Sequence, residues 1–181
     1  MINIEKIFKN LCFYYYIYYE MINANKGMYV EQLMNRTIQY YQINNIAHLE
    51  KRQIPIKILK HINREIVIAK LIDKAKVDYF LYINKKYVEI ECKQTKKDYF
   101  DLTLIRKHQE KYLNEIKKIG GIGLLIVYFE LFDQTIGIFY EELKKLIQKN
   151  KQKKIKYSLL KKYGTLIELI FPGILNLKKL F

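Results

Sequence analysis

A continuous apolar run at positions 123–131, GLLIVYFEL, is the feature that most restricts what this chain can fold into. An uninterrupted apolar run of this length is typical of a strand that is buried on both faces in the middle of a sheet. It follows an amphipathic segment, 103–121, which has helical spacing and closes on Gly120 and Gly121, residues that commonly end helices. A helix leading directly into a buried strand predicts an α/β domain, with helices packed on a central sheet.

The segments around this strand fit the same architecture. Residues 25–45 have apolar positions at helical spacing, and residues 77–95 predict a hairpin that turns at 84–86. Residues 136–140 predict a further strand, and residues 141–156 predict a helix that starts acidic and ends basic. The order is therefore helix, strands, helix, strand, strand, helix, which favours a mixed sheet with helices on its faces.

Residues 54–76 predict two strands, or an arm that projects from the body, which we call the stalk. Pro55 blocks a helix interior, and a β-branched run follows at 66–68. The segment is strongly basic, so it is a candidate surface for an anionic partner. Its basic residues are Lys57, Lys60, Arg64, Lys70, Lys74 and Lys76.

The net charge narrows the class of partner. Lys and Arg total 33 against 18 Asp and Glu, a formal charge of +15, which favours nucleic acid first and a membrane surface second. The two cysteines and three histidines are scattered along the chain and do not form a zinc-site pattern. This cysteine usage suits a reducing compartment, so we expect a cytoplasmic protein.

The length of 181 residues fits one domain with a sizeable core. An aromatic run at 11–19, LCFYYYIYY, is too short to span a bilayer, and Glu20 follows it where a signal peptide would carry small residues. Pro and Gly are scarce, and no linker or internal repeat divides the chain. We therefore expect an N-terminal extension over 1–22 and a single domain over 23–181, with the stalk at about 54–76.

The strand 88–95, VEIECKQT, alternates apolar and charged residues. Because successive side chains of a strand point to opposite faces, Glu89, Glu91 and Lys93 share one face. A solvated surface with a weak ion pair is one interpretation of that face, and this segment alone does not decide between it and a functional site. We interpret Glu89 as solvated. The opposite face is apolar and suits a core, with Val88, Ile90 and Cys92.

Asp78 gives the charged face a partner. It lies on the aromatic strand just before VEIECKQT, where Asp is an unusual residue, and paired strands lie about 4.8 Å apart. Asp78 and Glu91 would repel one another unless a cation joined them, and Mg²⁺ takes such oxygen ligands. Lys93 could then stabilise charge that develops on a phosphate. Gln109, a polar residue on the apolar face of the helix 103–119, is either a core amide or an amide that reaches this metal site.

The ordered motifs resemble one family of nucleases. Asp78 is followed after thirteen residues by Glu91, within E-x-K at 91–93, and then by His108 and Gln109. This arrangement resembles the PD-(D/E)xK pattern in the form found in the RecU-type Holliday junction resolvases. The resemblance runs in the same order from about residue 23 to the end. Its other pieces are NANKGM at 23–28 followed by Glu31, RQIPIKIL at 52–59, GGIGLLIVYF at 120–129 and the closing PGILNLKKLF.

The resemblance implies a restriction-endonuclease-like core with a mixed central sheet, flanking helices and a projecting β stalk. It also implies a Mg²⁺-dependent endonuclease that acts as a homodimer. Such an enzyme cuts two strands of a four-way DNA junction symmetrically, in recombination and repair. A recombinase partner would fit this role, but the sequence does not identify one.

The same resemblance implies roles for single residues. Asp78, Glu91 and Gln109 match metal-site positions, Lys93 matches the transition-state stabiliser, and Glu31 matches an early helical glutamate that we include among the catalytic candidates. The candidate DNA contacts are Lys26, Lys57, Lys60, Arg64 and Lys70.

Three positions depart from the family pattern. Lys76 stands where the family usually has a Thr of the metal site, and an ammonium cannot ligate a cation. Lys26 replaces an Arg and loses its bidentate contact to phosphate, and Leu81 replaces a Gly. Two alternative functions stay open: another DNA endonuclease with the same core, and a junction-binding recombination factor with little cleavage. A peripheral membrane protein is the least favoured interpretation.

Overall fold

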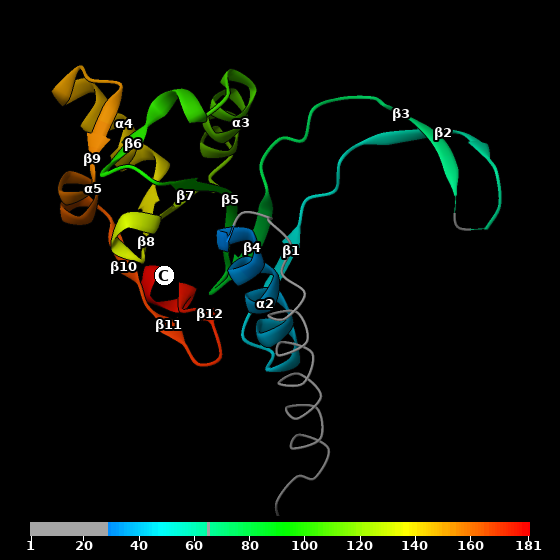
Figure 1. The fold of residues 1–181 in the computed structure, drawn as a ribbon, viewed down its shortest axis with the longest axis horizontal. Helices are drawn as coiled ribbons and strands as arrows, with labels where there is room; N and C mark the ends of the chain where they lie inside the picture. Colours follow the sequence, from blue (N-terminus) through cyan, green and yellow to red (C-terminus); the bar gives the residue numbers. More distant parts are fainter. Residues whose placement is uncertain (1–28, 65) are drawn as a thin grey trace, which may run out of the picture.

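The computed structural model describes residues 29–64 and 66–181, and a six-stranded mixed sheet forms the centre of this part of the chain (Figure 1). The strand order is β1-β4-β5-β7-β8-β10. The pair β5–β7 is parallel, and the other pairs in this sheet are antiparallel, so the predicted mixed sheet is confirmed. Its strands are β1 (His48–Lys51), β4 (Tyr79–Ile83), β5 (Lys86–Thr95), β7 (Ile122–Phe129), β8 (Gln134–Phe139) and β10 (Thr165–Ile167).

Helix α3 (Lys107–Lys118) connects the two parallel strands, because a parallel pair requires a long crossover. Its buried side chains, Gln109, Leu113 and Ile116, recur at helical spacing. The helix ends as predicted before Gly120, whose φ of +84° favours a residue without a Cβ. Its start was predicted too early, since residues before Lys107 form the 3-10 turn η1 (Leu102–Leu104).

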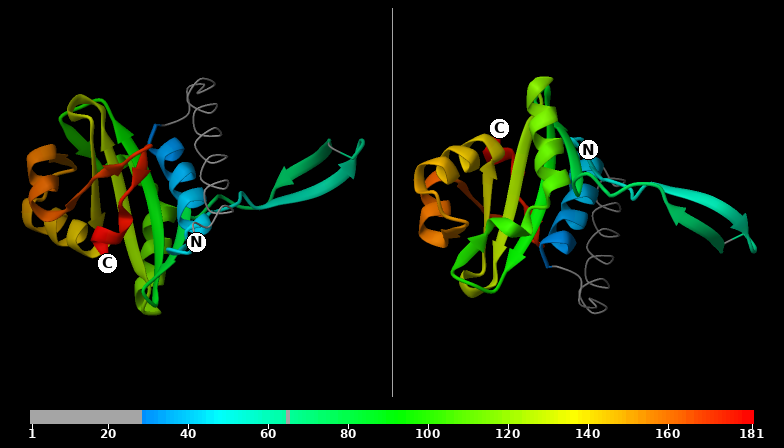
Figure 2. Two further views of the ribbon diagram at one scale, coloured as in Figure 1. Left: turned by 90° about the horizontal axis from the view of Figure 1, so that it is seen from below. Right: turned by 90° about the horizontal axis from the view of Figure 1, so that it is seen from above.

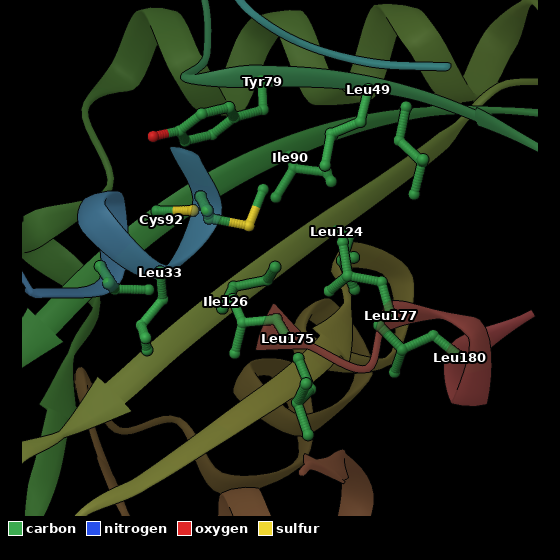
Figure 3. Packing of buried hydrophobic residues seen from close by; sticks show 14 of the residues in the cluster. Leu33, Leu49, Tyr79, Ile90, Cys92, Leu124, Ile126, Leu175, Leu177 and Leu180 are labelled. Carbon is green, nitrogen blue, oxygen red and sulfur yellow. The ribbon is translucent and has the colours of Figure 1, made fainter. Parts of the chain in front are cut away.

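One face of the sheet is covered by helix α2 (Tyr29–Ile43) and the C-terminal segment. Figure 3 shows Ile90 and Cys92 of β5 on the same side as Leu33 of α2. The alternation of VEIECKQT therefore predicts the core face of this strand correctly. The C-terminal elements on this side are β11 (Leu169–Ile170), β12 (Ile174–Leu175) and η3 (Leu177–Leu180).

The opposite face of the sheet is covered by α3, α4 (Tyr140–Asn150) and α5 (Tyr157–Tyr163). Leu125 and Val127 of β7 pack there with Leu113 of α3 and Leu143 of α4. The flanking helices confirm the predicted fold class. The remaining elements are β6 (Tyr99–Asp101), η2 (Glu130–Phe132) and β9 (Lys154–Lys156).

The helix predicted over 141–156 is shorter than expected. It stops at Asn150, and Lys151 takes a left-handed conformation with a φ of 52°. Residues 154–156 then pair with β6 as strand β9. A lysine-rich pattern is compatible with a helix, but pairing with a distant strand overrides that propensity here.

A two-stranded hairpin projects from the body, as predicted for the stalk (Figures 1 and 2). It consists of β2 (Ile56–His61) and β3 (Val67–Leu71), which pair antiparallel with a register shift between Ile58 and Lys60. Every residue of β2 is exposed, so this hairpin has no core of its own.

The expected N-terminal extension, the aromatic run at 11–19 and Lys26 lie outside the described residues. Among the helices that the structure does describe, none combines the length and the apolar character needed to cross a membrane.

Candidate active site

Asp78 and Glu91 meet across the hairpin β4–β5. The register pairs Tyr79 with Ile90, so Asp78, directly before β4, lies opposite Glu91. The backbone N–H of Asp78 donates to the carbonyl of Ile90 at 3.1 Å, and Asp78 Oδ2 accepts from the backbone N–H of Cys92 at 2.8 Å. Burial raises the pKa of Asp78 above its ordinary value. The structure thus brings the two predicted carboxylates together.

Glu91 is buried with a carboxylate oxygen left unpaired. Its Oε1 accepts from Gln109 Nε2 at 2.6 Å and from Lys93 Nζ, while its Oε2 is buried without a hydrogen-bond partner. Burial, and then the charge of Asp78, raise the pKa of Glu91 to about 7. An unsatisfied buried carboxylate oxygen is costly unless a cation or water completes it.

Gln109 is fixed at both ends of its amide. Its Nε2 donates to Glu91, and its Oε1 accepts from the backbone N–H of Arg106 at 2.9 Å, which forms part of a capping box at the start of α3. The predicted proximity of Gln109 to the carboxylates is present. In this arrangement Gln109 contacts the site as a donor that orients Glu91.

An open cleft of ≈ 970 Å³ lies beside these groups. Glu31 of α2 contributes to it and pairs with Lys51 at 3.0 Å. The negative charge of Glu31 contributes to raising the pKa of Asp78, which places the two carboxylates in one electrostatic environment. The polar side chains that line the cleft include Glu31, Asp78, Lys93, Arg106 and Gln109.

The carboxylates fit a hard divalent ion better than a soft one. In the part of the chain that the structure describes, no three His, Cys, Asp or Glu side chains gather closely enough to share an ion. Mg²⁺ is commonly held by one or two carboxylates together with waters and substrate phosphates. Asp78 and the unpaired Oε2 of Glu91 supply that donor set beside a cleft open to a substrate.

Lys76, at the position where the family usually has Thr, does not join this group. Its Nζ lies 4.8 Å from the centre of the Tyr112 ring, a cation–π contact. It lines a second, smaller cavity of ≈ 260 Å³. The ammonium is therefore directed away from the carboxylate pair and toward α3.

The interpretation of Glu89 as solvated is wrong. Its side chain is 0% exposed and is surrounded by hydrogen-bond donors. Arg52 donates to Glu89 from Nε at 3.2 Å and also from Nη2, and Tyr112 Oη donates at 2.8 Å. Tyr87 Oη donates to it as well. The reason for the error is helix α3, which covers the face that carries Glu89.

The βαβ connection explains why both glutamates have partners on α3. A crossover helix runs back along the strands that it joins, so residues later in α3 lie over residues earlier in β5. Gln109 accordingly contacts Glu91, and Tyr112, about one helical turn later, contacts Glu89. The face predicted from alternation is the one on which the site is built.

The candidate DNA contacts of the stalk are exposed. Lys57 and Lys70 lie directly opposite one another in the β2–β3 register, where like charges repel. Lys60 and Arg64 lie farther along the hairpin and are also exposed. These residues are separate from the carboxylates, which belong to the body (Figure 2).

Two arginines near the site were not identified from the sequence. Arg106 lines the cleft, and Arg52 binds Glu89. Arg106 directly precedes α3, whose third residue is the candidate Gln109. The closeness of Arg106 to Gln109 in the sequence is therefore a signal that could have placed Arg106 near the site. Arg52 had a weaker signal, since it begins the motif RQIPIKIL.

The chain is similar to known recombination proteins along most of its length. The family model described as "Recombination protein U" (RecU) matches residues 25–181. A "Holliday junction resolvase RecU" of Ureaplasma parvum is 34% identical over 160 residues, which cover 88% of this chain and 94% of that protein. The protein of the same description from Mycoplasmopsis pulmonis is 34% identical over 156 residues, covering 86% of this chain and 93% of that protein.

A more distant match agrees in description. A Holliday junction resolvase RecU of Bacillus cereus is 32% identical over 117 residues, covering 61% of this chain and 58% of that protein. Among solved structures, the Hjc Holliday junction resolvase of Archaeoglobus fulgidus reaches a TM-score of only 0.37 at 17% identity, covering 49% of this chain and 66% of that chain. The family assignment rests on the sequence matches, which confirm the resemblance found in the motifs. The chain belongs to the RecU recombination protein family.

Proposed function

We propose that this protein is a Mg²⁺-dependent endonuclease that resolves four-way DNA junctions by symmetric cleavage of two strands. The proposal is supported by family membership and by relatives described as Holliday junction resolvases. The observation that carries it is the unpaired, buried Oε2 of Glu91, whose neighbours Asp78 and Lys93 line an open cleft. That grouping suits hydrolysis of a phosphodiester.

Asp78 and Glu91 would hold the ion. Bound Mg²⁺ would polarise the scissile phosphate and lower the pKa of an attacking water. Gln109 keeps the Glu91 carboxylate in place, and the hydrogen bond from the Cys92 N–H does the same for Asp78. These contacts reduce the reorganisation that the site needs when substrate arrives.

Lys93 would stabilise the negative charge that accumulates on the phosphate. Its ammonium already contacts Glu91 and lines the cleft, so it can donate to a phosphate oxygen without leaving the site. Glu31 lines the same cleft, and we assign it a supporting electrostatic role through its effect on Asp78.

The stalk would contact the junction. Lys57 opposite Lys70 is an unfavourable pair in the free protein, and a polyanion between or beside the two ammonium groups relieves the repulsion. Lys60 and Arg64 extend this basic surface along the hairpin. We assign phosphate binding to these four residues, and we retain Lys26 as a fifth contact.

Symmetric cleavage requires two active sites related by a two-fold axis, so we propose a homodimer. Light scattering during size-exclusion chromatography should then report about twice the monomer mass of 22.0 kDa. A monomer at the concentration used for cleavage would contradict paired cutting.

The decisive experiment uses purified protein and a synthetic mobile four-way junction, with and without Mg²⁺. We expect Mg²⁺-dependent nicks at symmetric positions on two opposing strands. A linear duplex of the same sequence, at the same salt concentration, is the control, because phosphate binding alone is strongly salt-dependent.

Two other outcomes would identify the alternatives. Equal cleavage of the junction and the linear duplex would indicate a DNA endonuclease without junction preference. Tight junction binding without cleavage in either Mg²⁺ or Mn²⁺ would indicate a junction-binding recombination factor.

A further inference from the structure

We propose that Glu89 is a positioning residue: with Arg52 it clamps the root of the stalk to the strand that carries Glu91. The stalk root consists of the two segments that join the hairpin β2–β3 to the body, residues 52–55 and 72–77. The inference rests on the proposed function, because it concerns how DNA held by the stalk is aligned with the metal site.

Glu89, which is fully buried, is the centre of a polar cluster whose other members are partly exposed. Arg52 donates to both of its carboxylate oxygens, a bidentate arrangement that fixes direction as well as distance. Tyr87 and Tyr112 add hydroxyl donors to Oε1, and Arg52 Nη2 donates to Tyr87 Oη at 2.8 Å. A fully buried carboxylate tolerates burial only with such partners, so the geometry of this cluster is tightly specified.

The guanidinium is also held from the side. Arg52 Cζ lies 5.0 Å from the centre of the Phe80 ring, and the Phe80 and Tyr87 rings are 5.1 Å apart. The backbone N–H of Arg52 donates to the carbonyl of Asp78 at 2.8 Å. The first segment of the root is therefore attached both to Glu89 and to the backbone of a candidate metal ligand.

The second segment of the root reaches the same cluster. Lys76 lies over the ring of Tyr112, whose hydroxyl binds Glu89. The carbonyl of Ala75 is 3.1 Å from His108 Nε2, which ties this segment to α3 a second time. The N–H of Ile72 donates to the carbonyl of Pro55 at 3.0 Å and joins the two segments to each other.

The position of the clamp relates it to the chemistry. Glu89 and Glu91 lie two residues apart on one face of β5, and both are held by α3. The stalk itself has no core, so its direction depends on the root. Loss of the clamp should leave the metal site assembled but should let the stalk, and the DNA on it, move relative to that site.

The test uses a charge-neutral pair, Arg52→Met with Glu89→Gln, in the full-length protein. Removing both partners avoids the unpaired buried Glu89 carboxylate that the Arg52 change alone would leave, so the double variant should fold. We expect amide hydrogen exchange in peptides covering 52–55 and 72–77 to accelerate about tenfold or more, while exchange in β7 stays unchanged. Mn²⁺ binding, measured by calorimetry, should also stay within about twofold of the unaltered protein.

The cleavage readouts separate positioning from folding. On a junction with a fixed branch point, we expect kcat to fall about 10- to 100-fold with KM nearly unchanged, and the nicks to spread over neighbouring phosphates. The matched control removes an exposed ion pair between α3 and α4, in which Lys117 Nζ lies 2.8 Å from Glu141 Oε1. Its substitutions are Lys117→Met and Glu141→Gln. The control should cut at the original positions and rate.

Unchanged exchange at the root would overturn the clamp, whether or not the chain cuts junctions. Faster exchange together with unchanged cleavage positions and kcat would overturn its positioning role. If the unaltered protein cuts no junction, the proposed function fails, and the exchange measurement still decides whether Glu89 holds the stalk.

Discussion

The backbone N–H of Cys92 donates to Asp78 Oδ2 at 2.8 Å, which fixes the aspartate beside the segment between Glu91 and Lys93. The bond joins the residue directly before β4 to the middle of β5. It uses one carboxylate oxygen and leaves the other available, since a carboxylate accepts several hydrogen bonds or metal contacts.

Asp78→Asn should abolish junction cleavage while junction binding survives. The amide keeps the shape and can still accept from the Cys92 N–H, but it removes the negative charge that would hold the ion. Gel-based cleavage assays in Mg²⁺ and binding assays without metal measure the two effects.

Asp133→Asn is the matched control for that substitution. Asp133 has a φ of 47°, a conformation that Asn tolerates, and its carboxylate accepts a hydrogen bond from Tyr128 Oη at 2.8 Å, which the amide oxygen of Asn can also accept. This variant should cut at the normal rate. Wild-type cleavage by Asp78→Asn would contradict the proposed mechanism.

The raised pKa of Glu91 predicts how the stability of the metal-free protein depends on pH. Because the pKa is raised from 4.5 to about 7 in the folded chain, the folded state binds more protons between these values. The contribution of Glu91 to the free energy of unfolding is therefore present below about pH 4.5 and is lost as the pH rises toward 7.

Glu91→Gln removes this titrating group, so the difference between the two proteins isolates its effect. From pH 5 to pH 8, the free energy of unfolding of the unaltered protein should fall relative to that of Glu91→Gln. Urea unfolding of both proteins at the two pH values measures this difference. A difference that is constant across this range would show that Glu91 titrates normally.

Lys57→Ser with Lys70→Ser should weaken junction binding in a salt-dependent way. If both ammonium groups contact phosphates, their loss reduces the slope of log affinity against log salt by about 2. Fluorescence anisotropy over a series of salt concentrations measures the slope.

The control for the stalk variant is Lys161→Ser with Lys162→Ser on α5, across the body from the hairpin (Figure 1). It removes the same net charge from a different surface. Equal losses of affinity in the two variants would show that binding follows net charge rather than the stalk.

Lys76→Met should leave the affinity for divalent metal within about twofold of the unaltered protein, because its ammonium lies over Tyr112 rather than beside the carboxylates. Calorimetric titration with Mn²⁺ measures this. A large gain in affinity would show that Lys76 repels the ion and that its ammonium reaches the site in solution.

Local patterns were sufficient to predict the core of the fold. The apolar run of β7 and the amphipathic pattern of α3 are long enough for periodicity to identify them. Elements of two to four residues, such as β9 and β11, carry no readable period. They exist because partners distant in the sequence pair with them.

The same distinction applies to the site. Alternation in β5 correctly assigns Glu89 and Glu91 to one face, but whether that face meets solvent or a helix is decided by where α3 packs. The direction of the Lys76 side chain likewise depends on Tyr112 of α3. Sequence pattern therefore identified the neighbouring carboxylates better than the residues that support them.

The absence of a core in the hairpin β2–β3 has a consequence for handling the protein. A ribbon of two strands is only marginally stable in water by itself, so its far end opens more readily than the sheet of the body. Trypsin should cut first after exposed Arg64, which lies between the two strands at that end, and the two fragments should remain associated through the six-stranded sheet. Bound junction DNA should slow that cut, which gives a simple assay for occupancy of the hairpin.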